Sequence, residues 1–369
     1  MAGADPVALL DARLAGRRLT AEDALGLATL APLAELGAAA RELRYRIRPR
    51  RDVGYIVNTN INYTNVCITR CTFCSFQRWP GAEGGYVLGA DEVLARIERA
   101  RKLGATQVLL QGGHHPRLGL AYFEALLSAI RDRAPSIHVH ALSAPEVAHL
   151  SRTTGLDPTH LLERLAAAGL STMPGGGAEV LSDGVRRRIS PTKCSADEWI
   201  AIHRAAHGLG IRSSATMMFG TAEDDWSARV EHLIRLRALQ DETGGFTAFI
   251  AWAYQPPDAA AASAAGILDP VAPGNRSTQE YLRVVALARL VLDNVATIQA
   301  SPLTQAPGVV QLALDGGADD LGNVLLEEHV VGAAGVRPWL DEVGAIRLIT
   351  EAGYTARRRD TYYRDDPLR

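Results

Sequence analysis

The chain has 369 residues, which could form two or three average domains or one large α/β barrel with an added element. Its formal net charge is only -2 and 22% of its residues are charged, which argues against a nucleic-acid-binding face or a disordered tail. The N-terminus has no basic segment followed by an apolar core, and no run reaches about 18 apolar residues. We therefore expect a cytoplasmic protein with a small-molecule substrate and no nucleic-acid or membrane partner.

Residues 1–50 are predicted to form a helical extension. Thr20 is the expected N-cap of a helix, with Asp23 three residues further on, and apolar residues recur at helical spacing to about Ala40. At the other end of the chain, residues 336–369 are predicted to form one more helix followed by a polar tail.

Residues 51–335 contain eight apolar, β-branched runs, most of them separated by amphipathic helical segments. The runs are "YIVNTNINY", "TQVLLQGG", "IHVHALS", "LSTMPGGG", "IRSSATMMFG", "FTAFIAWAY", "ATIQASP" and "DDLGNV". This alternation predicts an α/β fold with parallel strands and crossover helices, and eight units favour a closed (βα)8 TIM-type barrel. An open doubly wound sheet is the alternative, but no glycine-rich dinucleotide turn follows the first strand.

Three of the four cysteines, Cys67, Cys71 and Cys74, lie in the loop after the first predicted strand. Barrel enzymes carry their chemistry at this end of the strands. Structural zinc is one interpretation, but it takes four ligands in pairs and there is no second pair. The fourth cysteine, Cys194, is expected to be a buried or partly buried free thiol. Three thiolates can bind three irons of a cubane cluster and leave the fourth iron open to another ligand.

The spacing Cys-x3-Cys-x2-Cys, with Phe73 before the last cysteine, resembles the signature of the radical S-adenosylmethionine superfamily. The resemblance implies a [4Fe-4S] cluster whose open iron binds S-adenosyl-L-methionine. It also implies an external reducing electron donor such as flavodoxin or ferredoxin. In such enzymes the cofactor carries out the radical chemistry, while the protein positions the reactants and excludes water.

Residues at other predicted strand ends are candidates for binding this cofactor. Two consecutive glycines after the second strand permit close backbone approach and resemble the superfamily's element for the methionine amino group. An ordinary turn is the alternative there. The carboxylate and hydroxyl after the third strand could reach a ribose or ammonium group, and the fifth strand could offer an apolar wall to adenine. The cofactor-binding candidates are Phe73, Gln111, Gly112, Gly113, Ser143, Glu146 and Met218.

Longer motifs resemble one family within this superfamily. "NINYTNVC", "LLQGGHHP", "PGGGAEVL", "RRRISPTKCSADEW" and "LLEEHVVGAAG" are similar to the cyclic dehypoxanthine futalosine synthase family of menaquinone biosynthesis. The likeness covers about residues 55–360. Aminofutalosine synthase and the tyrosine-using subunit of FO synthase are related in kind. The segments "AWAYQPPDAAAASAAG" and "QASPLTQAPG" depart from the family pattern and are expected to form loops on the substrate side.

The resemblance implies a radical cyclisation. The C4′ hydrogen of the dehypoxanthine futalosine ribose would be removed, the carbon radical would add to the benzoate ring, and a base would then take a proton. The candidates for this base are Glu179, His140 and Asp319 or Asp320. The substrate-binding candidates are Asn62, Tyr63, His114, Thr304 and Arg188, the last from the run Arg186 to Arg188.

Two alternatives to this function stay open. The altered loops are compatible with a related radical enzyme that acts on another small substrate. A non-catalytic iron-sulfur protein is the second alternative, and cleavage of S-adenosylmethionine would distinguish it from an enzyme. His203, His207 and His232 fall within predicted helices and are expected to pack against neighbouring elements or lie at the surface rather than bind a metal.

Overall fold

The computed structural model describes residues 5–365. Its strands are β1 (Asp52–Asn62), β2 (Gln107–Gln111), β3 (His138–Ala141), β4 (Ser213–Phe219), β5 (Phe246–Ala253), β6 (Ile298–Gln299), β7 (Asp320–Leu325) and β8 (Thr355–Arg358). Its helices are α1 (Pro6–Leu14), α2 (Ala21–Leu30), α3 (Leu33–Ile47), α4 (Ala90–Lys102), α5 (Leu120–Arg133), α6 (Ala144–Thr154), α7 (Pro158–Ala168), α8 (Asp183–Ile189), α9 (Ala196–Gly208), α10 (Trp226–Thr243), α11 (Ala259–Ala265), α12 (Thr278–Val291), α13 (Pro307–Asp315), α14 (Glu342–Glu351) and a 3-10 turn at Gly332–Ala334.

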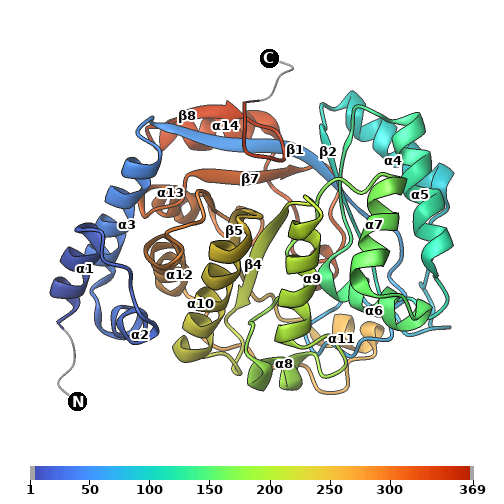
Figure 1. The fold of residues 1–369 in the computed structure, drawn as a ribbon, viewed down its shortest axis with the longest axis horizontal. Coiled ribbons are helices and arrows are strands. Elements are labelled where there is room, and N and C mark those ends of the chain that lie inside the picture. The colour runs from blue at the N-terminus through green and yellow to red at the C-terminus, as the bar shows by residue number, and fades with distance from the viewer. Residues whose placement is uncertain (1–4, 366–369) are drawn as a thin grey trace.

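Seven parallel strands form most of a barrel, in the order β3-β2-β1-β7-β6-β5-β4. Figure 1 labels β1, β2, β4, β5 and β7 among them. Between β3 and β4, Thr172 bridges to His140 and Met173 bridges to Ser213, both in parallel. The predicted fourth strand is thus reduced to these two bridging residues. The expected α/β barrel-type fold is confirmed, and the carboxyl ends of its strands face one side.

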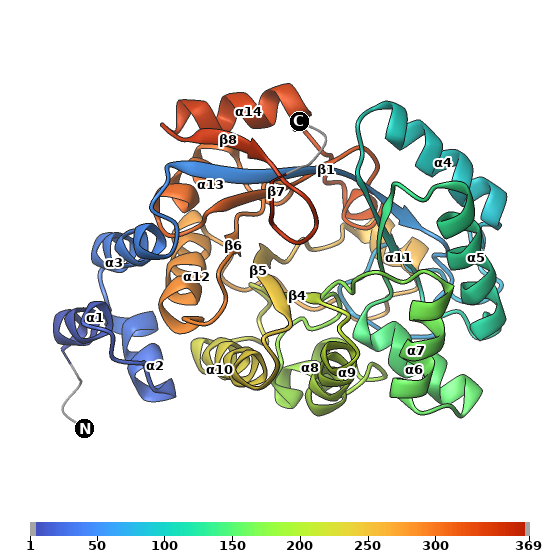
Figure 2. The same ribbon diagram turned by 45° about the horizontal axis from the view of Figure 1, so that its top comes forward.

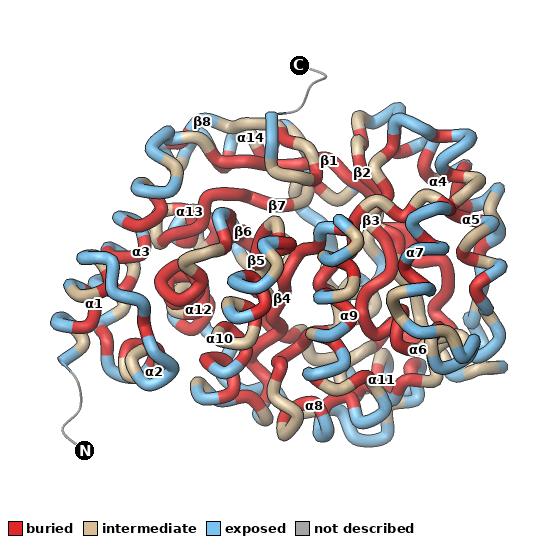
Figure 3. Tube along the Cα trace, viewed as in Figure 1, coloured by how far each residue is buried: buried red, intermediate tan, exposed pale blue. Residues whose placement is uncertain are grey.

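Helices cover the outside of the barrel, as seen for α7, α9, α10 and α12 in Figure 2. Helix α4 shows why: its buried residues Val93, Leu94, Ile97 and Ala100 recur at helical spacing and form one apolar face. Strands such as β1 and β4 are almost continuously buried, whereas the outer faces of the helices are exposed (Figure 3). This is the pattern of a parallel sheet covered by crossover helices. No helix within residues 5–365 is long and apolar enough to cross a bilayer.

The N-terminal helices pack beside the barrel, α2 against α10 and α3 against α12. The predicted cap is confirmed, because Thr20 and Asp23 form a reciprocal capping box at the start of α2. The periodicity predicted helix to about Ala40, but the structure breaks it at Pro32 and continues α3 to Ile47. Proline cannot donate the backbone hydrogen bond that a continuous helix needs. We propose that residues 1–50 form a distinct extension; residues 1–4 lie outside the described part.

The C-terminal segment is built differently from the predicted polar tail. After α14, strand β8 pairs in parallel with Asp52–Tyr55 at the start of β1. A basic residue of this strand can lie in the sheet because its charge is neutralised within the protein: Arg357 forms an ion pair with Asp52 at 2.8 Å. The sequence shows no apolar alternation that would have indicated a strand here. Residues 366–369 of the proposed C-terminal unit 336–369 lie outside the described residues.

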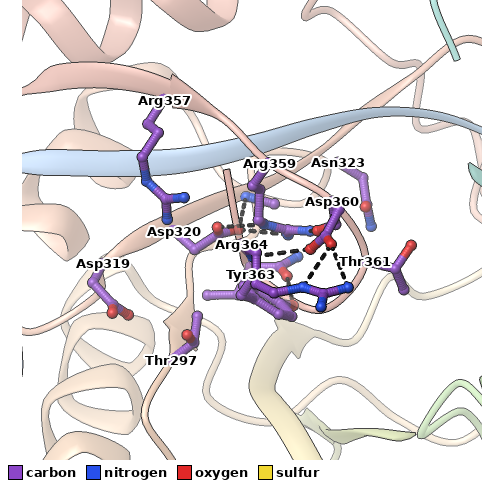
Figure 4. A network of polar contacts seen from close by, with 12 residues as sticks. Thr297, Asp319, Asp320, Asn323, Arg357, Arg359, Asp360, Thr361, Tyr363 and Arg364 are labelled. Carbon is purple, nitrogen blue, oxygen red and sulfur yellow. Dashed lines mark hydrogen bonds and ion pairs between the residues drawn. The ribbon is translucent and has the colours of Figure 1, made fainter. Parts of the chain in front are cut away.

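Beyond β8 the chain turns across the amino-terminal end of the barrel (Figure 4). Arg359 donates from Nε and Nη2 to the two carboxylate oxygens of Asp320, the first residue of β7, at 2.6 and 2.8 Å. Thr361 donates to Gln107, the first residue of β2. The segment from Arg359 to Tyr363 therefore forms a floor beneath the barrel.

We predict that Arg359→Met destabilises the fold strongly. Both side chains of the Arg359–Asp320 pair are at most 3% exposed, so the substitution leaves a buried carboxylate without its partner. Such a loss costs about 3–5 kcal/mol, which urea unfolding would measure. Arg364→Met is the matched control, because Arg364 pairs with Asp360 while 71% of its side chain is exposed. An exposed pair contributes about 0–1 kcal/mol, so equal losses in the two variants would contradict the assignment of a buried pair.

Candidate functional site

A cavity of about 420 Å³ runs through the barrel from the cysteine loop to the floor segment. This volume lies in the range of small-molecule sites. All three clustered cysteines line it at one end, and Arg359, Thr361 and Tyr363 line it at the other. The cavity also brings together Gly112, Ser143, Glu179 and Met218 from the ends of different strands.

The cysteine loop follows β1 and is fixed by backbone contacts to distant segments. The amide of Thr72 donates to the carbonyl of Ile189 at 2.9 Å, and the thiol sulfur of Cys67 accepts from the amide of His114 at 3.3 Å. Burial raises the pKa of Cys71 to about 12, and the neighbouring Cys74 and Cys67 act in the same direction. A metal cluster would stabilise the thiolate form that burial of Cys71 disfavours.

The number of ligands distinguishes a cluster from a structural zinc ion. Three thiolates bind three irons of a cubane and leave the fourth iron open, whereas structural zinc takes four protein ligands. Cys67, Cys71 and Cys74 thus fit a [4Fe-4S] cluster with one open iron better than structural zinc. Cys194 is a buried free thiol outside this cavity lining, as expected.

Lys193 is a charged residue of the cavity that the sequence prediction missed. Its Nζ lies 2.7 Å from Oε1 of Glu179 and 5.2 Å from the centre of the Phe73 ring. Glu179 has a φ of 45°, a conformation that non-glycine residues seldom adopt. Strained backbone of this kind is common at ligand sites. The pair therefore places a cation and a carboxylate beside the cysteine loop, where a zwitterionic ligand could be held.

The two glycines after β2 are required by close packing. A Cβ on Gly112 would lie 2.6 Å from the Tyr63 ring, and one on Gly113 would lie 2.4 Å from the carbonyl of Val66 and 2.9 Å from Cβ of Cys67. The turn consequently lies directly against the cysteine loop. Gln111 and both glycines line the cavity.

Glu146 holds this turn in place. Its Oε1 accepts from the Tyr63 hydroxyl at 2.7 Å and from the amide of Gly112 at 2.9 Å. Its Oε2 accepts from the amide and hydroxyl of Ser143 at 2.7 and 2.5 Å. All the acceptor positions of the carboxylate are thereby used within the protein. The structure indicates that Glu146 positions the turn, and it places Tyr63 beneath the turn rather than in the cavity lining.

We predict that Gly113→Ala lowers both stability and cluster content. The added methyl group must displace the Cys67 loop, and such overpacking costs about 1–3 kcal/mol. Iron and sulfide analysis of the reconstituted protein, together with thermal unfolding, would measure both effects. Gly119→Ala is the matched control, because a Cβ there meets no atom within 4 Å. Full cluster loading in the Gly113 variant would show that the contact is not needed.

The remaining candidates divide between the cavity and other places. Asn62, His114, His140 and Thr304 line the cavity. Arg188 lies outside its lining and pairs with Glu223 with 53% of its side chain exposed, so the structure does not place it near a substrate. The first residue of β7, Asp320, is held by Arg359 and is likewise absent from the lining.

Asp319 and Arg186 are also buried and bound to other parts of the protein. Asp319 is buried against Arg289, with 2.8 Å between Oδ1 and Nη2. Arg186 is buried and donates to the carbonyls of Gly177 and Cys194. Their sequence positions gave no sign of this burial.

An apolar wall lies next to the cysteine loop. Met218 packs in a small cluster with Val180, Val185 and Tyr254, and Phe73 and Trp252 pack against it. The segments that depart from the family pattern reach the same cavity, which is lined by Trp252, Ala253, Tyr254, Gln255, Ser301, Pro302, Leu303 and Thr304. Differences in those segments can therefore change what the cavity accepts.

The predicted helix-packing histidines behave as expected. His203, on α9, and His232, on α10, are fully buried. His203 lies 2.9 Å from the Ser213 hydroxyl, and Nδ1 of His232 accepts from the amide of Leu181 at 2.9 Å. His207 on α9 makes similar contacts with Thr243 and Ser213.

Polar atoms without partners suggest where a ligand could bind. Asn62 and Ser75 line the cavity, and Oδ1 of Asn62 and Oγ of Ser75 are buried without a hydrogen-bond partner among the described residues. Buried polar atoms are normally paired, so each is available to a bound cofactor or substrate. Together with the three thiols and the Lys193–Glu179 pair, they fit a cluster with a polar, zwitterionic ligand.

Comparison with known proteins agrees with this chemistry. Residues 61–234 match the family model of the Radical SAM superfamily, and residues 243–368 match that of the CofH/MqnC C-terminal region. The chain is 42% identical to a cyclic dehypoxanthine futalosine synthase of Streptomyces coelicolor, over 99% of this chain and 91% of the relative. It is 38% identical to an aminodeoxyfutalosine synthase of Thermus thermophilus, over 95% and 93%.

Solved structures share the fold. The hydrogenase maturase HydG of Carboxydothermus hydrogenoformans superposes with a TM-score of 0.72 at 18% identity, covering 97% of this chain and 80% of that one. Methylornithine synthase superposes with a TM-score of 0.70 at 18% identity, covering 94% and 97%.

Proposed function

The chain belongs to the radical S-adenosylmethionine superfamily and carries the CofH/MqnC C-terminal region, and from this premise we propose that it cyclises dehypoxanthine futalosine in menaquinone biosynthesis. It is a radical S-adenosylmethionine enzyme with a [4Fe-4S] cluster and S-adenosyl-L-methionine as cofactors. The observation that carries the choice of substrate is the 42% identity, over 99% of the chain, to a relative with that name.

The residues of the cavity divide into a cofactor end and a substrate end. Cys67, Cys71 and Cys74 would hold the cluster, and the ammonium group of Lys193 offers a partner for the carboxylate of the cofactor's methionine. The bound cofactors supply a 5′-deoxyadenosyl radical. A reducing donor such as flavodoxin or ferredoxin is part of this proposal.

The substrate end extends from the cysteine loop toward the floor segment. Asn62, His114 and Thr304 line the cavity, with His114 beside the cysteine loop, and can donate or accept hydrogen bonds. Burial lowers the pKa of His114 well below its ordinary value, so this ring would act as a neutral hydrogen-bonding group. The Thr69 hydroxyl lies 2.7 Å from its Nδ1 and fixes its orientation.

Among the candidate bases, the cavity favours His140. Glu179 lies beside the cysteine loop in its ion pair with Lys193, and Asp320 is held by Arg359 outside the cavity lining. His140 lines the cavity, and burial lowers its pKa to about 3, so the imidazole is neutral at neutral pH. Its Nδ1 contacts Thr172, while Nε2 has no protein hydrogen bond within residues 5–365. We propose that Nε2 of His140 accepts the proton that the cyclised radical must lose to restore aromaticity.

Anaerobic incubation of the reconstituted enzyme with reductant, S-adenosyl-L-methionine and dehypoxanthine futalosine tests the proposal. We expect mass spectrometry to detect 5′-deoxyadenosine together with a cyclised product that has lost two hydrogen atoms. Release of 5′-deoxyadenosine without this product would reject the substrate.

A second candidate is a related radical enzyme that acts on another small substrate. It is favoured by the altered loops along the cavity and by the 38% identity to a relative named aminodeoxyfutalosine synthase. Incubation with the substrates of such relatives under the same conditions would distinguish the two candidates.

A further inference from the structure

Two histidines of β3 are joined by one threonine hydroxyl. His138 and His140 lie two residues apart on β3, and their side chains point to the same side of the strand. The hydroxyl of Thr172 lies 2.7 Å from Nε2 of His138 and 2.7 Å from Nδ1 of His140. Thr172 is held there by the two-residue bridge that closes the barrel. The result is an unbroken chain of hydrogen bonds, His140–Thr172–His138.

This chain can transmit a proton. A threonine hydroxyl has one proton to donate and two lone pairs to accept. If Nδ1 of His140 donates to Thr172, the hydroxyl donates to Nε2 of His138. When Nε2 of His140 takes up a proton, Nδ1 can release its own proton to the oxygen of Thr172. The hydroxyl can then release its proton to Nε2 of His138. Burial lowers the pKa of His138 to about 4 and that of His140 to about 3, so both rings are neutral acceptors before the reaction.

The chain leads away from the cavity. Both rings are partly exposed, but only His140 lines the cavity, so the exposed part of His138 lies outside the cavity lining. The ring of His138 packs edge-on against Tyr362 at 5.3 Å, in the C-terminal segment that forms the barrel floor. The charged groups that face His138 are Asp360, which favours its protonation, and Arg364, which opposes it. His140 faces His138 and Arg359, and both oppose its protonation.

We propose that Thr172 and His138 form a proton relay that carries the proton released by the cyclised radical from His140 to solvent at the floor of the barrel. The inference rests on the proposed function. The ring C–H bond breaks, its electron pair remains with the ring, and the proton goes to Nε2 of His140. One electron leaves to a one-electron acceptor of the iron-sulfur class. The proton on Nδ1 of His140 passes to Thr172, and that of the hydroxyl passes to Nε2 of His138.

Thr172→Val and Thr172→Ser test the relay in the reconstituted enzyme. Valine keeps the shape and removes the hydroxyl, whereas serine keeps the hydroxyl. With C4′-deuterated dehypoxanthine futalosine, we expect both variants to transfer deuterium to 5′-deoxyadenosine. In Thr172→Val the yield of cyclised product per 5′-deoxyadenosine should fall by about tenfold. A fall of this size is smaller than the rate enhancement of about 10²–10⁴-fold that general acid–base catalysis typically contributes, because His140 remains as the base. Thr172→Ser should recover most of this yield, and His138→Gln, which cannot ionise, should resemble Thr172→Val.

A spectroscopic measurement tests the chain independently of turnover. In the full-length protein labelled with 15N-histidine, one of the two ring nitrogens that face Thr172 should carry a proton and the other should not. Thr172→Val should remove this complementary pattern, and Thr172→Ser should retain it. Equal product yields in Thr172→Val and wild type, or failure of Thr172→Ser to recover the yield, would overturn the relay alone. If the wild-type enzyme gave no cyclised product, the proposed function would fall and the role of the relay with it.

Discussion

Replacement of Cys67, Cys71 or Cys74 by alanine is expected to abolish the iron-sulfur absorbance and the release of 5′-deoxyadenosine. Each thiol would bind a different iron of the cluster, and all three line the same end of the cavity. No other cysteine lines it, so a lost ligand has no substitute from this residue type within the described cavity. The absorbance of the anaerobically reconstituted protein and chromatography of the nucleoside product measure the two effects.

Cys194→Ala is the control for these variants. The thiol of Cys194 is buried and lies outside the cavity lining, and the backbone carbonyl of Cys194 accepts a hydrogen bond from Arg186. We expect this variant to keep both the absorbance and nucleoside release. Loss of the cluster in Cys194→Ala would mean that a fourth cysteine binds it, and the open iron would no longer be available to S-adenosylmethionine.

The second large effect is a loss of stability in mild acid. Burial lowers the pKa of His140 and His232 to about 3 and that of His138 and His207 to about 4. In the unfolded chain a histidine takes up its proton near pH 6.5. The unfolded state therefore binds more protons, and the stability contributed by each neutral histidine is complete above pH 6.5 and falls as the pH drops. The loss is about 1.4 kcal/mol per histidine for each pH unit between 6.5 and the folded-state pKa of about 3 or 4.

Urea unfolding at pH 7.5 and 5.5 measures this loss. We expect a marked fall in the unfolding midpoint, since several histidines contribute together. His160→Gln is the matched control: the residue is exposed on α7, so the substitution should leave the pH dependence unchanged. His232→Gln should weaken the pH dependence, although it also changes the contact with the amide of Leu181. A midpoint that stays constant between the two pH values would contradict the description of these histidines as buried and neutral.

Much of the barrel could be predicted from the sequence, because buried parallel strands leave continuous apolar runs between amphipathic helices. The fourth run shows the limit of this signal. "LSTMPGGG" looks like a strand, but only Thr172 and Met173 bridge to their neighbours, since the following proline and glycines favour a turn. The pattern located the segment correctly and overestimated its length.

The cysteine end of the site was predictable because ligand spacing is local in the sequence. The contributions of Lys193, Thr172 and Arg359 were not, since each depends on contacts between distant segments. The charged run from Arg186 to Arg188 illustrates the same limit, because one arginine is buried and another is exposed within a single helical turn. A polar side chain gives no sequence signal of whether the fold will bury it and provide a partner.

We propose that this enzyme removes the C4′ hydrogen of dehypoxanthine futalosine and cyclises the resulting radical. Turnover of the C4′-deuterated substrate, followed by mass spectrometry of both products, tests it most directly. We predict deuterium in 5′-deoxyadenosine together with a cyclised product that has lost it. Unlabelled 5′-deoxyadenosine, with the substrate recovered unchanged, would contradict the claim and favour a related radical enzyme with a different substrate.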